Sequence, residues 1–347
     1  MKVISLFSGC GGIDLGFIKA GATILWANDI DCDAVKTYKH NIGDHIVCKD
    51  IYKVDTDDIP NDADMIAGGF PCLGFTVAKG KSRNINDSVN FLYKEYIRVL
   101  KAKKTKYFLI ENVPGMKSGK EFNQFFDNMI KEFEEVGYRV KYKTLLASDY
   151  GVPQNRKRII IIGTRNDVNK EPNFPSPTHS KDGDLLLKPY VTIKDAISDL
   201  PEEYSELIPN HIGSKHKVKI NGYVGNRQLD WNRPSPTITG RGSRSGGAVI
   251  HPHPNNKRRL SVRECARLQS FPDDFIFLGS NGAAFAHIGN AVPPILAFYL
   301  AKEFIKVIDD KEVTFNSNDW NLPWLKTSKL EKNINNINDK NVKINCI

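Results

Sequence analysis

Short apolar runs alternate with polar, glycine-containing turns through the first half of the chain. Runs of this length, bounded by turn residues, favour buried strands over helices. We predict strands at 3–7, 23–27, 65–67, 107–110, 138–147 and 158–163, with a further short strand that closes at Asp50-Ile51.

Helical periodicity is clearest between Phe122 and Val136, where apolar residues recur at spacings of three and four. This pattern predicts one face of an amphipathic helix that ends at Gly137. Further helices are predicted after Gly12 and Cys32 and over 91–100 and 291–308. Strands that alternate with helices in this way predict an α/β fold.

The character of the sequence changes at about residue 166. Proline, glycine, histidine and charged residues become more frequent and the periodicity fades, so we predict a second, smaller and loop-rich domain over 166–260. Residues 261–310 are expected to complete the first domain, 1–165, and the polar end of the chain, 311–347, to form a flexible tail.

Positive charge is abundant and unevenly placed. The 347 residues carry a formal net charge of +9, which fits a polyanionic partner. The basic run 241–267 is expected to contact phosphates, so that binding weakens with salt, and 156–158 forms a second basic cluster. The alternative is a basic surface that only keeps the protein soluble. No run reaches the roughly 18 to 20 apolar residues of a membrane span, and the N-terminal apolar stretch is too short for a signal peptide.

Six cysteines occur without any Cys-x-x-Cys pair. This spacing argues against a zinc site and against a disulfide framework, and favours a reducing cytoplasm. His251-Pro252-His253 could ligate a metal in principle, but no cysteine or carboxylate pair nearby completes a site. We therefore expect a turn with two solvated histidines and no bound metal.

A glycine-rich turn, Ser8 to Gly12, separates the first strand from the first helix. This order lets a backbone approach a nucleotide-like ligand at a helix N-terminus, and is shared by NAD, FAD and S-adenosylmethionine binders. Asp29 follows the second strand, where such folds hold a ribose. It could instead cap the helix that begins near Cys32.

The stretch Gly68-Gly69-Phe70-Pro71-Cys72 follows the strand at 65–67 and places a thiol after a sharp turn. One interpretation is a small buried cysteine without a function of its own, and the other is a nucleophile at the carboxyl edge of the sheet. The polar residues 79–90 that follow are a candidate lid. Glu111 ends the strand at 107–110, where it is either catalytic or a helix cap, and the following Pro114-Gly115 weakens the cap interpretation.

Six separated motifs together resemble the DNA cytosine-5 methyltransferases of the prokaryotic restriction–modification type, over about residues 1–308. The motifs are Phe7-Ser8-Gly9-Cys10-Gly11-Gly12, Pro71-Cys72, Glu111-Asn112-Val113, Gln154-x-Arg156-x-Arg158, and the pair formed by 263–269 and Gly289-Asn290-Ala291-Val292. The resemblance implies a Rossmann-like S-adenosylmethionine-dependent sheet, with 166–260 as a target-recognition domain that resembles those of enzymes methylating GGCC-type sites.

The resemblance also implies the roles of individual residues. The implied catalytic residues are Cys72, Glu111, Arg156 and Arg158. Cofactor contacts are implied for Phe7, Ser8, Gly9, Cys10, Gly11, Gly12, Asp29, Ile30, Asp50, Ile51, Pro71, Leu92, Asn290 and Ala291. DNA contacts are expected from Lys81, Arg83, Arg227, Thr237, Thr239, Arg241 and Arg244. The expected partners are S-adenosylmethionine, converted to S-adenosylhomocysteine, and double-stranded DNA. The enzyme is expected to be a cytoplasmic monomer without metal, and a cognate endonuclease to be its functional partner.

Other functions remain open from the sequence. An RNA cytosine-5 methyltransferase of the same superfamily would share every catalytic residue. A nicotinamide or flavin enzyme would explain only the first turn, and a DNA-binding relative without activity would not need both Cys72 and Glu111.

Overall fold

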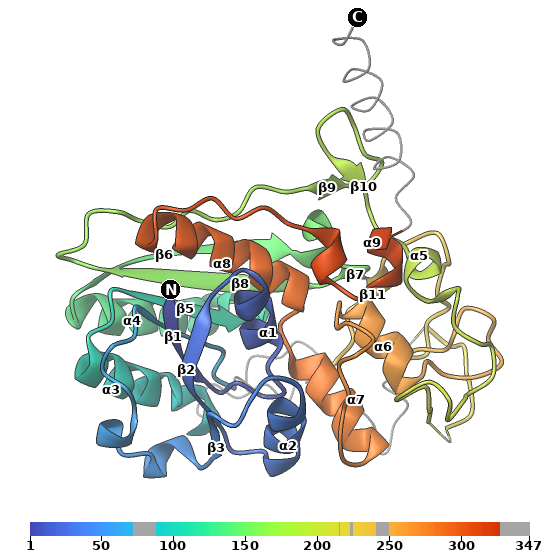
Figure 1. Ribbon diagram of the computed structural model, residues 1–347, viewed down its shortest axis with the longest axis horizontal. Helices are drawn as coiled ribbons and strands as arrows, with labels where there is room; N and C mark the ends of the chain where they lie inside the picture. The colour runs from blue at the N-terminus through green and yellow to red at the C-terminus, as the bar shows by residue number, and fades with distance from the viewer. Residues whose placement is uncertain (72–87, 215, 223–224, 241–249, 327–347) are drawn as a thin grey trace, which may run out of the picture.

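A seven-stranded sheet forms the centre of the protein in the computed structural model, which describes residues 1–71, 88–214, 216–222, 225–240 and 250–326. The strand order is β3-β2-β1-β4-β5-β8-β6 (Figure 1). The first five strands run parallel, whereas β8 is antiparallel to both β5 and β6. The strands are β1 (Lys2–Leu6), β2 (Thr23–Asp29), β3 (Ile46–Cys48), β4 (Met65–Gly68), β5 (Tyr107–Asn112), β6 (Tyr138–Leu146) and β8 (Lys157–Arg165). The predicted α/β fold is confirmed; β3, however, ends before Asp50-Ile51, which follow it in a loop and a single helical turn, Ile51–Lys53.

Alternate residues of the central strands supply two hydrophobic cores, one on each face of the sheet. In β5, Tyr107 and Leu109 join one cluster while Phe108 and Ile110 join the other. The first face is covered by α1 (Gly12–Lys19), α2 (Cys32–Asn41) and α8 (Pro294–Ile308), and the second by α3 (Tyr93–Lys103) and α4 (Lys120–Glu135).

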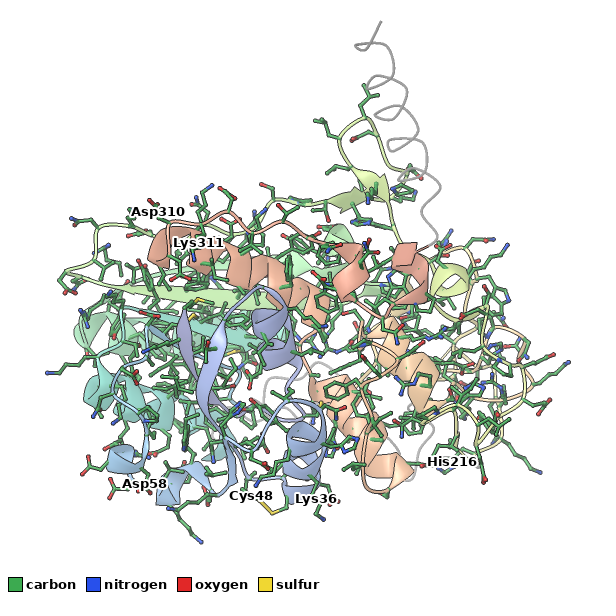
Figure 2. All side chains as sticks on the ribbon, in the orientation of Figure 1. Lys36, Cys48, Asp58, His216, Asp310 and Lys311 are labelled. Atoms are coloured by element: carbon green, nitrogen blue, oxygen red, sulfur yellow. A yellow bond between two sulfur atoms is a disulfide. The ribbon has the colours of Figure 1, made fainter. Side chains whose placement is uncertain are left out.

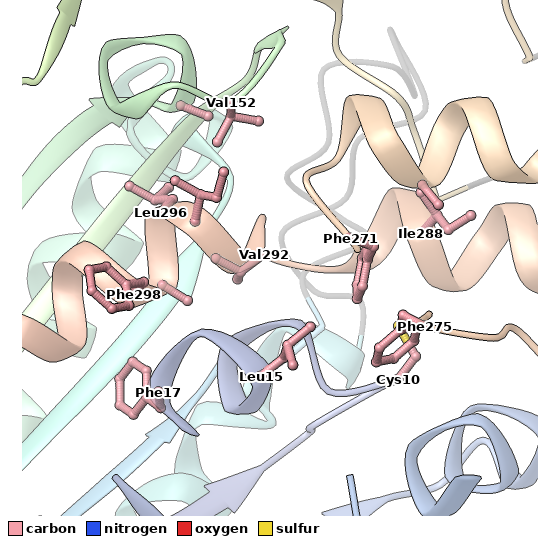
Figure 3. Close-up of a cluster of buried hydrophobic side chains, with 14 of the residues drawn as sticks. Cys10, Leu15, Phe17, Val152, Phe271, Phe275, Ile288, Val292, Leu296 and Phe298 are labelled. Carbon is pink, nitrogen blue, oxygen red and sulfur yellow. The ribbon is translucent and has the colours of Figure 1, made fainter. Parts of the chain in front are cut away.

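The chain returns to the sheet after the loop-rich region. This return comprises α6 (Val262–Leu268), α7 (Asn281–Asn290) and α8. Helices α1 and α8 pack without a side chain between them at Gly16, because a Cβ atom there would overlap the Pro294 carbonyl oxygen. Figure 3 shows the hydrophobic cluster to which Leu15 and Phe17 of α1 and Leu296 of α8 all belong.

The loop-rich region has few regular elements. They are β7 (Gln154–Asn155), which pairs with β11 (Ser235–Pro236), β9 (His179–Ser180), which pairs with β10 (Lys188–Pro189), and α5 (Ile193–Ile197). Two further short helices, Ser317–Asp319 and α9 (Pro323–Lys326), follow α8. Since regular hydrogen bonding is sparse here, side chains must hold many of the loops.

Buried arginines provide much of that support. Arg259 is almost fully buried and donates to the carbonyls of Gly225, Ile250 and Lys217 and to the side chain of Asn226. One guanidinium with five N–H donors can therefore hold several loop carbonyls at once.

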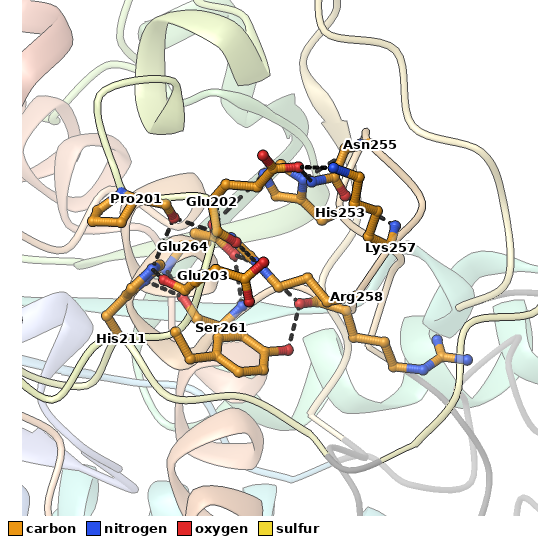
Figure 4. A network of polar contacts seen from close by, with 12 residues as sticks. Pro201, Glu202, Glu203, His211, His253, Asn255, Lys257, Arg258, Ser261 and Glu264 are labelled. Atoms are coloured by element: carbon orange, nitrogen blue, oxygen red, sulfur yellow. Dashed lines mark hydrogen bonds and ion pairs between the residues drawn. The ribbon is translucent and has the colours of Figure 1, made fainter.

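Neighbouring arginines also point inward. Arg258 pairs with both carboxylate oxygens of Glu264, at 2.7 and 2.8 Å, as Figure 4 shows. Arg267 makes a similar two-point contact with Asp273, at 2.7 and 2.8 Å. Arg263 donates to three carbonyls, those of Pro209, Pro272 and Phe275, and burial lowers its pKa to about 10.

The expectation that the whole basic run 241–267 faces DNA phosphates is therefore wrong for its second half. Arg258, Arg259, Arg263 and Arg267 are used inside the protein, where guanidinium groups satisfy carbonyls and carboxylates. Only Lys257 of the described basic residues in this run is exposed, and it pairs with Glu202 at 2.9 Å.

The prediction of a flexible tail is also wrong for the described residues 311–326. Trp320 and Leu322 are buried, and Trp320 lies close to Phe298 of α8 with ring centroids 6.1 Å apart. These aromatic contacts bury apolar area that a frayed tail would leave in water.

Two inferences about cysteine and histidine need correction. Cys32 and Cys48 form a disulfide, drawn in yellow beside the label of Cys48 in Figure 2. One bond does not make a disulfide framework, but it removes cysteine spacing as an argument for a reducing compartment. His251 and His253 are buried and not solvated, and burial lowers the pKa of His251 to about 4.

We expect the disulfide to stabilise the fold measurably. A bond that closes a loop of 16 residues contributes about 3 kcal/mol by restricting the unfolded chain. Dithiothreitol should therefore lower the midpoint of urea unfolding, and the protein carrying both Cys32→Ser and Cys48→Ser should show the lower midpoint with or without the reductant. Equal thiol counts in denatured protein with and without reduction would contradict the bond.

No helix in the described part of the chain combines the length and hydropathy needed to cross a bilayer.

Candidate active site

The turn after β1 has a backbone shape that brings N–H groups to the carboxyl edge of the sheet. Phe7 has φ 54°, and Gly9 and Gly11 have φ 55° and 93°. A left-handed conformation at a bulky residue such as Phe7 is costly and is typical of functional turns. A Cβ atom on Gly11 would overlap the Ile42 side chain, so glycine is required there for space as well as for φ.

A buried polar chain anchors this turn from below. Ser8 Oγ donates to Ser5 Oγ at 2.9 Å, and Ser5 Oγ donates to Asp14 Oδ1 at 2.7 Å. Burial raises the pKa of Asp14 to about 6. Sequence reasoning missed Asp14, which looks like an ordinary first-turn carboxylate until its burial is known.

Asp29 closes the turn from the neighbouring strand. Its Oδ2 accepts from the Gly9 N–H at 2.7 Å and its Oδ1 from the Asp31 N–H at 2.8 Å. The helix cap that Asp29 might have supplied comes from Asp31, whose Oδ1 accepts from Ala34 and Asp33. Asp29 is therefore a turn residue at the expected ribose position.

Other predicted cofactor residues lie on the adjoining loops of the same edge. Ile30 is 67% exposed, although it is a large apolar residue. Asp50 accepts from the Tyr52 N–H at 3.1 Å, and Ile51 is buried beside it. An exposed isoleucine next to these loops can provide an apolar surface for a flat ring.

The turn rests on the segment that follows α7. A Cβ atom on Gly12 would overlap the Val292 carbonyl oxygen and lie 3.0 Å from the Ala291 Cβ. Cys10 points inward, with its Sγ 3.7 Å from the His287 carbonyl oxygen, and burial raises the pKa of its thiol. Only the backbone of Cys10 is therefore available to a ligand in the turn.

The glycines before Cys72 are required by close packing. A Cβ atom on Gly68 would overlap the Leu6 carbonyl oxygen, and one on Gly69 would lie 3.0 Å from Glu111 Oε2. Phe70 is buried, and its carbonyl oxygen accepts from Asn112 Nδ2 at 3.2 Å. The described chain thus passes directly beside Glu111. Cys72 itself, together with Lys81 and Arg83, lies outside the described residues.

Glu111 forms an ion pair with Arg158 across neighbouring strands. Glu111 Oε1 lies 2.6 Å from Arg158 Nε. The Glu111 side chain is 10% exposed and the Arg158 side chain is 11% exposed. The antiparallel pairing of β5 and β8 brings the two residues together at the carboxyl end of β5. The pair places a carboxylate and a guanidinium side by side at the end of the strand that carries Glu111.

Arg156, predicted as catalytic, has a different environment. It is fully buried, and its guanidinium donates to the carbonyls of Ile238, Gly289 and Ala291 at 2.8–2.9 Å. These contacts occupy it inside the protein, and we therefore reassign it from a catalytic residue to a positioning residue.

Only some of the predicted DNA-contacting residues lie in the described part of the chain. Thr237 donates to the Asn155 carbonyl at 3.0 Å, and Thr239 has a buried Oγ1 without a hydrogen-bond partner. Arg227 is exposed. Arg241 and Arg244 lie outside the described residues.

The comparison with known proteins identifies this constellation. The family model described as C-5 cytosine-specific DNA methylase matches residues 1–306. The chain belongs to this family. The predicted family membership and the α/β fold are thus confirmed.

Individual relatives of this DNA methylase agree with the assignment. It is 39% identical to the Type II methyltransferase M.NgoFVII of Neisseria gonorrhoeae, over 89% of this chain and 87% of that protein. It is 38% identical to the Type II methyltransferase M.MthTI of Methanothermobacter thermautotrophicus, over 89% and 98%. A solved Escherichia coli structure, described as a prophage-encoded DNA modification methyltransferase, superposes with a TM-score of 0.69 at 26% identity, covering 89% and 99%.

The turn of this DNA methylase fits the adenosyl cofactor that the family implies. The glycine turn, the Asp29 carboxylate that accepts from it and the exposed Ile30 meet at one strand edge. In the described ranges, no three His, Cys, Asp or Glu side chains are grouped to hold a metal ion. A surface cavity of about 680 Å³, lined by Leu100, Glu135 and Arg165 among others, lies at the opposite end of β5 and β8 and is not part of this site.

Proposed function

We propose that this DNA cytosine-5 methyltransferase methylates a cytosine that is flipped out of a short double-stranded site. The observation that carries the proposal is the Glu111–Arg158 pair beside Gly69, three residues before Cys72. The Type II relatives support a role as the protective half of a restriction–modification system. An endonuclease of the same specificity would be a functional partner, and the methyltransferase would act as a monomer.

S-adenosylmethionine, when bound, supplies an electrophilic methyl group and leaves as S-adenosylhomocysteine. The turn from Phe7 to Gly12 would hold it through backbone N–H groups. Asp29 would accept from the ribose hydroxyls and Ile30 would cover one face of the adenine. Asp50, Ile51, Pro71, Leu92, Asn290 and Ala291 would complete the cofactor site without a metal.

Cys72 would act as the nucleophile, as the resemblance to the family implies. Carbon 5 of cytosine is too weak a nucleophile to attack a methyl sulfonium unaided. Addition of the Cys72 thiolate to carbon 6 forms a C–S bond and moves an electron pair toward carbon 5. After methylation, loss of the carbon 5 proton and expulsion of the thiolate restore the ring.

Glu111 and Arg158 would act on one edge of the same ring. Cytosine N3 and O2 lie on the same edge of the ring, separated only by carbon 2, so groups that contact both must themselves be neighbours. The 2.6 Å contact between the two side chains meets this requirement. Glu111 would hydrogen-bond or protonate N3, which favours addition at carbon 6, and Arg158 would stabilise charge at O2.

The base must leave the duplex to reach these groups. Thr237 and Thr239 precede the predicted recognition loop that contains Arg241 and Arg244, and arginine is the most common partner of guanine O6 and N7. Arg227, Lys81 and Arg83 would contact the DNA as well. We propose a GGCC-like target, on the resemblance of the recognition domain.

Bisulfite sequencing of DNA from cells that express the protein tests both activity and target. We expect one short motif to carry 5-methylcytosine, and the Cys72→Ser variant expressed in parallel to leave the DNA unmodified. Unmodified DNA with the active gene, together with methyl transfer to tRNA in vitro, would instead favour the RNA-methylating alternative. Methylation at another motif would contradict only the GGCC-like assignment.

A further inference from the structure

Residues 289–292, here called the bridge segment, lie between the cofactor turn and the residues that precede the predicted recognition loop. On one side, a Cβ atom on Gly12 would overlap the Val292 carbonyl oxygen. On the other side, a Cβ atom on Gly289 would overlap the backbone carbonyl of Thr239. Neither contact leaves room for another side chain, so a displacement of the bridge segment must displace one of its neighbours.

Two buried glutamines connect the bridge segment to the recognition domain. The Ile238 N–H donates to Gln154 Oε1 at 3.1 Å, and Gln154 Nε2 donates to Gln269 Oε1 at 2.6 Å. Gln269 Nε2 then donates to the Ala291 carbonyl at 2.6 Å. Both glutamines are fully buried, where each hydrogen bond is strong and a lost partner is costly.

Arg156 makes a second connection between the same two segments. Its Nη1 donates to the Ile238 carbonyl at 2.9 Å, and its Nη2 donates to Gly289 and Ala291 at 2.8 and 2.9 Å. The N–H and the carbonyl of Ile238 are therefore both held by side chains that also reach the bridge segment, directly or through Gln269.

We propose that Gln154, Arg156 and Gln269 are positioning residues that couple cofactor binding to DNA target binding through the bridge segment. The inference rests on the proposed function. A cofactor in the Phe7–Gly12 turn fixes the bridge segment, and the bridge segment fixes the residues from which the recognition loop departs. Because such coupling is reciprocal, bound target DNA must tighten cofactor binding by the same factor.

The test is the Gln269→Met variant, which removes the connection through the glutamines with little loss of volume and leaves the connection through Arg156 in place. No polar group loses its last partner, because Gln154 still donates to the Leu268 carbonyl and Ala291 still accepts from Arg156. The dissociation constant of S-adenosylhomocysteine is measured calorimetrically, alone and with a duplex that contains the motif found by bisulfite sequencing. In the unmodified enzyme we expect the duplex to tighten binding at least about fivefold, and in Gln269→Met by a clearly smaller factor, to which the connection through Arg156 still contributes.

Gln228→Met is a control with the same substitution at an exposed position of the recognition domain. Gln228 lies in the recognition domain and donates to the carbonyls of Leu229 and Pro254, both at 3.2 Å, without touching the bridge segment. It should keep the full coupling factor. Gly240→Ala is a second test variant, since its Cβ would displace the Asn290 side chain from the recognition side, and it should lower the coupling factor as well.

The outcomes separate the inference from the proposed function. Unchanged coupling in Gln269→Met, or in Gly240→Ala if Gln269→Met does not fold, would overturn the inference. An equal loss in Gln228→Met would overturn it too, because the effect would then be general destabilisation. A protein that binds cofactor but no methylatable duplex would contradict the proposed function itself.

Discussion

A duplex that carries 5-fluorocytosine at the target position will trap the enzyme covalently in the presence of S-adenosylmethionine. Fluorine replaces the hydrogen that must leave carbon 5, so methylation can proceed while elimination of the Cys72 thiolate cannot. The complex should survive denaturing gel electrophoresis and should accumulate only when the methyl donor is present.

Cys72→Ser should give no covalent complex, because a serine hydroxyl is a far weaker nucleophile than a thiolate. Methyl transfer to ordinary DNA should fall by more than about 10³-fold, as expected for loss of a nucleophile. Cys346→Ser is the matched control and should trap normally. If Cys72→Ser traps as well as the unmodified enzyme, another residue is the nucleophile.

Glu111→Gln should lower the rate of methyl transfer by about 10²- to 10⁴-fold, the usual contribution of a positioned acid or base. Glutamine keeps the shape next to Gly69, but it can neither protonate cytosine N3 nor form the ion pair with Arg158. Single-turnover kinetics with labelled S-adenosylmethionine measure the effect on the chemical step.

The cofactor dissociation constant of Glu111→Gln should change little, since Glu111 contacts none of the predicted cofactor residues in the turn. Glu95→Gln provides a matched control: Glu95 also pairs with an arginine, Arg98, at 2.7 Å, but on α3. Glu95→Gln should keep its activity. A collapse of cofactor affinity in Glu111→Gln would identify Glu111 as a cofactor ligand or a structural residue.

The local features of the site could be predicted from the sequence because they depend on residues that are close together along the chain. Runs of apolar residues located six of the seven strands of the sheet closely, and only the third strand was misplaced by a few residues. Glycine at 9, 11, 68 and 69 marked turns, of which the first two have left-handed φ values and the last three have close contacts that leave no room for a Cβ atom. Glu111 was expected at the end of a buried strand, and it is the penultimate residue of β5.

Other features depend on residues that are far apart in the sequence. The pairing of Glu111 with Arg158 follows from the antiparallel register of β5 and β8, which local pattern does not specify. The link between Gln154 and Gln269 spans 115 positions. Both glutamines belong to sequence motifs, but their contact with each other appears only when the surrounding segments are assembled.

The sequence by itself determined how strands and helices follow one another along the chain, the family motifs and the excess of positive charge. Only the tertiary structure decided which of those charged side chains could contact another molecule and which are used inside the protein. Arg259, Arg263 and Arg267 face inward, because loop carbonyls and carboxylates from distant segments converge on them. A count of charges cannot reveal this, since the direction of a side chain is set by the polar groups that the fold brings within hydrogen-bonding distance.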